Sequence, residues 1–152
     1  IDSVQKARSV LTLTGAAGVM IGRAAQGQLW LPGAIASALM AGDEQARTPT
    51  LTEQLCLQSD HLLRLHDFHG AHMGPRIARK HQAWLLESLT AQRVISAEDA
   101  RARRQAFNRL ESAEAQVECL GEMTDALMSA SPATASTIQM FSQLCPQMSE
   151  AA

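Results

Sequence analysis

One short, unbroken apolar run at residues 19–21 (Val-Met-Ile) limits how the N-terminal part of this chain can fold. Helical periodicity over residues 3–13 precedes it, with Ser3 as a candidate N-cap, and Gly22-Arg23 ends it abruptly. A run without polar alternation predicts a strand that is buried on both faces, as in a parallel sheet. Helix, turn, strand and loop together are typical of an α/β repeat, and one such unit cannot close a sheet by itself.

The rest of the pattern is helical, which makes this a mostly α chain. A helix is predicted at residues 34–41, and the polar stretch at 42–50 is predicted to be a linker. From residue 50 onward the periodicity predicts a small bundle of four helices, at about 51–69, 75–89, 97–110 and 112–128. Gly70 is expected to end the first of these helices, and Pro75 to lie in the first turn of the second. Residues 129–152 are rich in Ser, Thr, Ala and Pro and are expected to form a flexible tail.

Bulk composition excludes several classes of protein. The chain has 152 residues, an apolar share of 46% and a formal net charge of −2, which is typical of a globular protein. No apolar run approaches the roughly 20 residues of a membrane span, and the N-terminus does not resemble a signal peptide. The three cysteines, at 56, 119 and 145, are widely spaced, so neither a zinc motif nor a disulfide framework is indicated. We expect reduced thiols in a cytoplasmic protein.

The Gly22-Arg23 step is a candidate anion site. Glycine lets backbone N–H groups approach a phosphate closely, a helix starting in the small residues behind it would add a favourable partial charge, and Arg23 offers a forked donor. Barrel proteins commonly hold a cofactor phosphate at the ends of their last strands. The residues alone also allow a simpler interpretation, in which the glycines end a strand and Arg23 is solvated.

Basic residues concentrate between positions 64 and 109, which hold nine of the thirteen Lys and Arg. On the helix predicted at 75–89, Arg76 and Lys80 are four residues apart and share a face, with Arg79 beside them. Such a face suits contact with nucleic-acid phosphates, although an ordinary solvated face is the alternative. The histidines at 61, 66, 69 and 72 lack the spacing of a metal site, so no metal is expected.

Several of these segments resemble the bacterial tRNA-dihydrouridine synthases. The resemblance covers about residues 1–128 and corresponds to the C-terminal portion of the family. It is carried by the segments Thr-Gly-Ala-Ala-Gly-Val-Met-Ile-Gly-Arg-Ala-Ala-Gln-Gly at 14–27, Leu-His-Asp-Phe-His-Gly at 65–70 and Gly-Pro-Arg-Ile-Ala-Arg-Lys-His-Gln-Ala-Trp at 74–84. The order of the last two behind the first makes the resemblance specific.

The resemblance implies that residues 1–41 are the C-terminal strand-helix unit of an FMN-binding TIM barrel and that residues 51–128 are a helical tRNA-binding domain. The family uses FMN, reduced by NADPH, to convert uridine in tRNA to 5,6-dihydrouridine, with a cysteine as general acid. Carried over to this sequence, Gly22 and Arg23 would hold the FMN phosphate. The residues that would face tRNA are Arg76, Arg79, Lys80 and His81. The protein is expected to be cytoplasmic and monomeric.

The sequence also departs from the family. Ala17, Leu29, His69 and Leu85 stand where Asp, Pro, Tyr and Tyr are usual, and residues 90–101 look like an insertion. No cysteine of this chain matches the family's catalytic cysteine, which we expect upstream, so the isolated chain is expected to be inactive. Two alternatives remain: a non-catalytic helical RNA-binding module, and a helical protein that has lost RNA binding.

Overall fold

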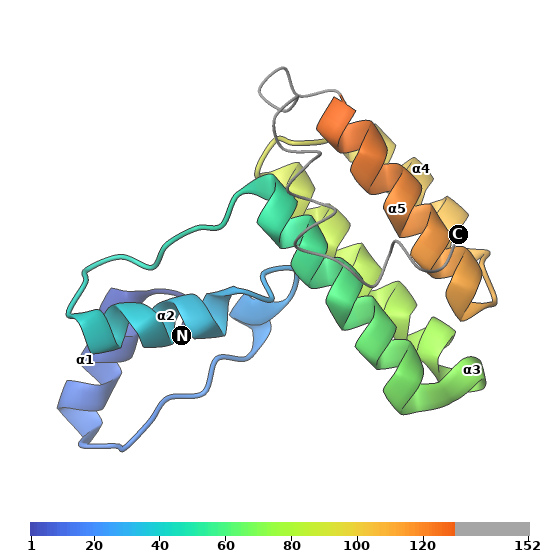
Figure 1. Ribbon diagram of the computed structural model, residues 1–152. Coiled ribbons are helices and arrows are strands. Elements are labelled where there is room, and N and C mark those ends of the chain that lie inside the picture. The colour runs from blue at the N-terminus through green and yellow to red at the C-terminus, as the bar shows by residue number, and fades with distance from the viewer. Residues whose placement is uncertain (130–152) are drawn as a thin grey trace.

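The computed structural model describes residues 1–129, and the regular structure of this part of the chain consists of helices joined by loops. Figure 1 shows two parts: helices α1 and α2 lie on one side, and α3, α4 and α5 form a bundle on the other. Of the predicted tail, only Ser129 lies within the described residues. The bounds of the elements are α1 Val4–Thr14, the 3-10 turn η1 Arg23–Ala25, α2 Leu31–Ala41, α3 Leu51–Ala91, α4 Ala97–Asn108 and α5 Ala113–Ser129.

The strand predicted at residues 19–21 is wrong, because residues 1–129 contain no strand. A lone strand leaves its backbone N–H and C=O groups without partners, so an apolar run forms a strand only where neighbouring strands accept it. Val19 and Ile21 instead pack, half-buried, against the small core of the N-terminal part, while Met20 is 87% exposed. The observed fold class is therefore all-α over the described residues, rather than α/β followed by a bundle.

Local signals mark several ends of the two N-terminal helices. The Ser3 hydroxyl accepts a hydrogen bond from the Lys6 backbone N–H, which confirms the predicted N-cap, and Gly15 ends α1 in the left-handed conformation. Helix α2 begins at Leu31, three residues before the predicted start, with proline in its first turn. The core between the two helices consists of Val4, Ala7, Leu31, Ile35 and Ala38.

A capping box fixes the start of α3. The Thr50 hydroxyl accepts from the backbone N–H of Glu53, and the Glu53 carboxylate accepts from the backbone N–H of Thr50. Arg47 donates to both oxygens of the same carboxylate, at 2.8 and 3.0 Å. The Arg47 guanidinium, followed by the two Thr50 donors, lowers the pKa of Glu53 to about 2. The chain therefore passes from the polar linker into α3 at the predicted residue.

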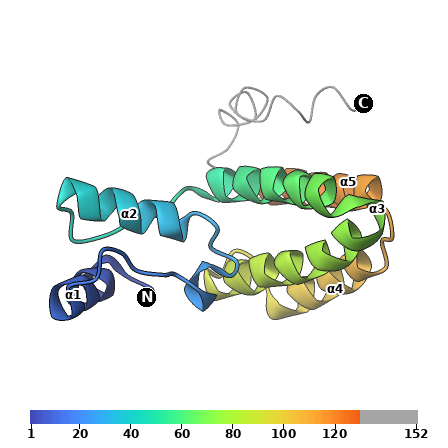
Figure 2. The same cartoon turned by 90° about the horizontal axis from the view of Figure 1, so that it is seen from below.

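Helix α3 turns back on itself at Gly70, whose φ of 70° and ψ of 176° are not helical. The prediction that Gly70 interrupts the helix is confirmed by these angles. A positive φ of this size strongly favours glycine, which explains why the interruption lies at this residue. The chain becomes helical again immediately, so Pro75 lies inside the returning helix and not in its first turn. Figure 2 shows the two arms of α3 running side by side in opposite directions. A Cβ on Gly74 would lie 3.0 Å from the Cα of His66, so the arms meet closely near the turn.

Helices α4 and α5 cover one side of the folded-back α3. The shared core is aliphatic apart from Phe107, and its largest members include Leu55, Leu62, Leu86, Leu89 and Leu120. The apparent insertion at 90–101 forms the end of α3, a tight turn and the first turn of α4, where the Ser96 hydroxyl accepts from the Asp99 backbone N–H. Among residues 1–129, no helix has the length and apolar character needed to cross a membrane.

Candidate functional site

The Gly-Arg segment forms the surface loop that leads into η1. Gly22 is the residue before this 3-10 turn, and Arg23 is its exposed first residue. The turn is closed by hydrogen bonds from Ala25 to Gly22 and from Gln26 to Arg23, both near 3.0 Å. The helix expected behind Arg23 is therefore a single 3-10 turn, so the partial charge of a long helix is not available. The first N–H groups of such a turn have no partner within it and can serve an anion.

Gly27 anchors this loop on the bundle. It has a φ of 74°, and a Cβ at this position would lie 2.2 Å from the carbonyl oxygen of Trp84 in the returning arm of α3. Only glycine permits both this backbone conformation and this close approach. Residues 22–27 are therefore held near Trp84 by direct backbone packing, a contact that their spacing in the sequence did not indicate.

The four predicted RNA-binding residues lie in three different environments. Arg76 and Lys80 are exposed, and the Lys80 ammonium lies 4.9 Å from the centre of the Trp84 ring. Arg79 is half-buried and donates to the carbonyl oxygen of Leu110, just after α4, at 3.1 Å. Its Nε atom is buried without a hydrogen-bond partner. Arg76 and Lys80 are thus available to an external phosphate, whereas Arg79 connects α3 to the junction between α4 and α5.

His81 is also half-buried, and it pairs with a histidine on the other arm of α3. Its Nδ1 lies 2.9 Å from Nε2 of His61, and its ring meets Trp84 edge-on with the ring centres 5.0 Å apart. One histidine of such a pair must be neutral, because a hydrogen bond between the two rings needs one free acceptor nitrogen. Burial lowers the pKa of His61, with the Asp60 carboxylate opposing the shift. Burial also lowers the pKa of His81, and positive charge on His61, Lys80 and His69 lowers it further.

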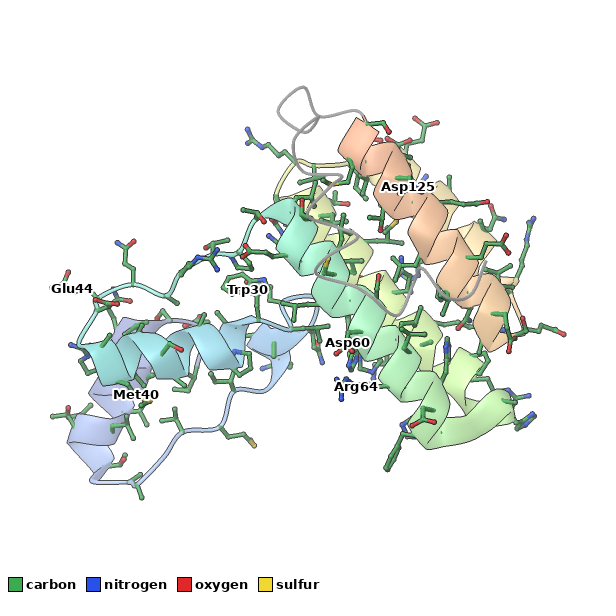
Figure 3. All side chains as sticks on the ribbon, viewed as in Figure 1. Trp30, Met40, Glu44, Asp60, Arg64 and Asp125 are labelled. Atoms are coloured by element: carbon green, nitrogen blue, oxygen red, sulfur yellow. The ribbon has the colours of Figure 1, made fainter. Side chains whose placement is uncertain are left out.

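The other basic residues of the 64–109 stretch divide between paired and unpaired positions. Arg64 donates to Asp60 at 2.7 Å, and Figure 3 shows both on the side of α3 that is turned toward α2. Arg104 lies 3.6 Å from Glu87. These exposed pairs reduce the net positive field of the bundle. The remaining exposed cations are Arg76, Lys80, Arg93, Arg101 and Arg109.

A large cleft lies between α2, the linker and the first arm of α3. Its volume is about 1080 Å³, and its lining is mostly small or apolar. The charged lining residues are mainly acidic, namely Asp43, Glu53 and Asp60, and Arg47 is already bound to Glu53. Such a lining does not favour a polyanion, so the cleft is a poorer candidate for nucleic acid than the face that carries Arg76 and Lys80.

The remaining histidines do not converge on a common centre. His66 is buried and its Nε2 lies 2.9 Å from the Gln116 side-chain oxygen, whereas His69 is exposed and meets the ring of Phe68. Among residues 1–129, no three side chains of His, Cys, Asp or Glu are placed to share a metal ion. Phe68, which was not among the predicted site residues, is 84% exposed.

Comparison with known proteins agrees with the segments identified in the sequence. The model of the family described as "Dihydrouridine synthase (Dus)" matches residues 1–149. The chain is 46% identical over 117 residues to tRNA-dihydrouridine synthase B of Pseudomonas syringae pv. tomato. The aligned region covers 76% of the chain and 32% of that protein. It is 41% identical over 120 residues to tRNA-dihydrouridine synthase B of Vibrio cholerae serotype O1. Here the aligned region covers 79% of the chain and 34% of that protein.

The chain thus spans about one third of the length of these curated relatives. The match to the family model extends over nearly the whole sequence, including the Gly22-Arg23 loop and both arms of α3. The resemblance seen in the sequence is therefore confirmed: the chain belongs to the dihydrouridine synthase (Dus) family.

Proposed function

We propose that this chain is the C-terminal part of a tRNA-dihydrouridine synthase and that its helical bundle binds tRNA. The observation that carries the proposal is the exposed pair of cations, Arg76 and Lys80, on one face of the returning arm of α3. They are four residues apart, so both can reach neighbouring phosphates of one nucleic-acid backbone. Trp84 supports the Lys80 ammonium from below, which leaves its N–H groups free to donate outward.

Arg79 and His81 have supporting roles in this proposal. Arg79 holds the α4–α5 junction against α3 through Leu110, and His81 joins the two arms of α3 through His61. Both contacts fix the face on which Arg76 and Lys80 lie. A binding face that is rigid before RNA arrives loses less conformational entropy on binding.

We also propose that Gly22 and Arg23 bind the phosphate of FMN in the complete protein. The donor set fits this group, because Arg23 is exposed and the first amides of a 3-10 turn lie beside it. When bound and reduced by NADPH, FMN supplies the hydride for reduction of the uridine 5,6 double bond. The role proposed for this chain is to hold the phosphate. Gly27, packed against Trp84, keeps the loop of Gly22 and Arg23 close to the helix that carries Arg76 and Lys80.

Binding of unmodified tRNA across a salt series tests the RNA-binding proposal. An Arg76→Ala/Lys80→Ala variant is expected to bind at least tenfold more weakly, with a slope of log affinity against log salt smaller by about 1.5. The matched control is Lys6→Ala/Arg101→Ala, which removes two exposed cations from α1 and α4. An equal loss in the control would mean that total charge, and not this face, determines binding.

The phosphate proposal has a separate test. The phosphorus NMR signal of FMN is expected to shift on titration with the complete protein, and an Arg23→Gln variant of that protein is expected to lose the shift. A shift that is the same in both proteins would remove Arg23 from the site.

A further inference from the structure

Phe68 is exposed in a way that the other described phenylalanine is not. Its side chain is 84% exposed, whereas Phe107 is 2% exposed in the core of the bundle. Phe68 lies two residues before the turn at Gly70, and its ring meets the ring of His69 edge-on at a centre-to-centre distance of 4.9 Å. The chain has few aromatic residues, and this one is exposed to solvent beside the Gly70 turn of α3.

Phe68 lies on the same helical hairpin as several of the basic residues of the 64–109 stretch. It follows Arg64 by four residues on the same helix and therefore lies on the same face. The contact of His61 with His81, and that of His66 with Gly74, set the two arms of α3 in antiparallel register. Arg64 consequently lies level with the part of the returning arm that carries Arg76.

Two acidic residues, Asp60 and Asp67, are close to Phe68 in sequence, and Asp60 offsets the charge of Arg64. Asp60 is bound to Arg64 at 2.7 Å. Asp67 is the residue before Phe68, and successive helix residues point about 100° apart, so its carboxylate lies on another side of the arm. The ring is thus an exposed aromatic group on the same helical hairpin as the exposed cations Arg76 and Lys80, and proteins hold unpaired nucleotides with aromatic and cationic groups of this kind.

We propose that Phe68 stacks on an unpaired base of the RNA whose phosphates Arg76 and Lys80 bind. This inference rests on the proposed function and adds a second kind of contact to it. A protein partner fits less well, because Met73, at 46% exposure, is the only other large apolar side chain of residues 1–129 that is exposed near the turn. One ring and one thioether are far smaller than the roughly 800 Å² that each side of a stable protein interface buries.

Two substitutions of Phe68 in the full chain test the proposal. Phe68→Leu keeps an apolar side chain but removes the ring, and it is expected to weaken binding of unmodified tRNA by about 5- to 100-fold. Phe68→Tyr keeps the ring and is expected to bind as the wild type does. Because a stack carries no charge, the salt slope is expected to stay unchanged in both variants. A fully paired RNA duplex, which offers no unpaired base, is expected to bind both variants and the wild type equally.

The possible outcomes distinguish this inference from the proposal beneath it. If Phe68→Leu binds tRNA as the wild type does while Arg76→Ala/Lys80→Ala does not, stacking is refuted and RNA binding stands. If Phe68→Leu and Phe68→Tyr lose affinity equally, the ring is not what the RNA contacts. If Phe68→Leu changes the sedimentation of the chain without changing its tRNA affinity, Phe68 is a protein contact. If the folded wild type binds no tRNA, both proposals fail.

Discussion

The two parts of the described chain differ in how much of their apolar surface they bury. In the bundle, α3, α4 and α5 enclose a continuous aliphatic core around Phe107. In the N-terminal part, a core of five small and medium side chains lies between α1 and α2. Leu13, Met20 and Met40 remain 83 to 90% exposed there, and Figure 3 labels Met40 on α2.

This difference shows what each part needs in order to be stable. The backbone hydrogen bonds of the bundle lie within its helices, and its buried apolar side chains share one core. The N-terminal part carries an apolar run, residues 19–21, that is only partly buried: Val19 and Ile21 pack against its small core, and Met20 is exposed. Gly27 of the N-terminal part packs closely against the backbone of Trp84 in the bundle. A substitution at Gly27 therefore tests how strongly the stability of the two parts is coupled.

The largest effect on stability is expected from Phe107→Ala in the bundle core. Removing a fully buried ring should lower the free energy of unfolding by about 3–5 kcal/mol, since the cavity cannot close completely. Urea unfolding followed by circular dichroism measures this change. Phe68→Ala is the matched control, because the same side chain is exposed there, and a change below about 0.5 kcal/mol is expected. Equal losses at both positions would contradict the described packing.

Gly27→Ala should have the next largest effect, and it tests the link between the two parts. The added methyl group meets the Trp84 carbonyl at 2.2 Å in a backbone conformation with φ of 74°, so a loss of about 1–3 kcal/mol is expected. Gly33→Ala is the control, because it adds a methyl group to α2 where no atom lies within 4 Å. That change should stabilise by about 0.5–1 kcal/mol. A Gly27→Ala protein as stable as the wild type would mean that the loop does not rest on α3.

Arg79→Ala should lower the free energy of unfolding by no more than Gly27→Ala does. Comparing Arg79→Ala with Arg76→Ala separates an arginine that stabilises the fold from one proposed to bind RNA. Losing the charged hydrogen bond to Leu110 should lower the free energy of unfolding by about 1–2 kcal/mol. Arg76→Ala should change stability by less than about 0.5 kcal/mol, because Arg76 is exposed. Thermal unfolding compares the two variants directly. A larger loss for Arg76→Ala would reverse the roles given to the two residues.

The smallest effect is the pH dependence that the His61–His81 pair confers. Both pKa values are lowered in the folded protein, so the folded state binds fewer protons than the unfolded state as the pH falls. The stabilising contribution is therefore complete above the unfolded histidine pKa of about 6.5 and is lost as the pH falls through the folded values. Unfolding in urea at pH 7.5, 6.5 and 5.5 measures the loss. A His61→Gln/His81→Gln variant should show a flatter dependence on pH than the wild type does.

The sequence alone determined most of the helices of this protein and the segments that place it in its family. The N-cap at Ser3, the start of α3 at residue 51 and its interruption at Gly70 all followed from local signals, because capping and glycine geometry involve only residues near one another in the chain. The family segments at 14–27 and 74–84 are likewise contiguous, and the comparisons confirm the resemblance they carry.

Tertiary structure decided what local signals could not. Residues 19–21 have the composition of a buried strand, but strand formation depends on hydrogen bonds from another segment, which residues 1–129 do not supply. Arg76, Arg79 and Lys80 look equivalent in sequence, yet only Arg79 contacts Leu110, because that carbonyl is brought to α3 by the packing of α4. The pairing of His61 with His81 joins residues that are far apart in sequence, since it depends on α3 folding back at Gly70.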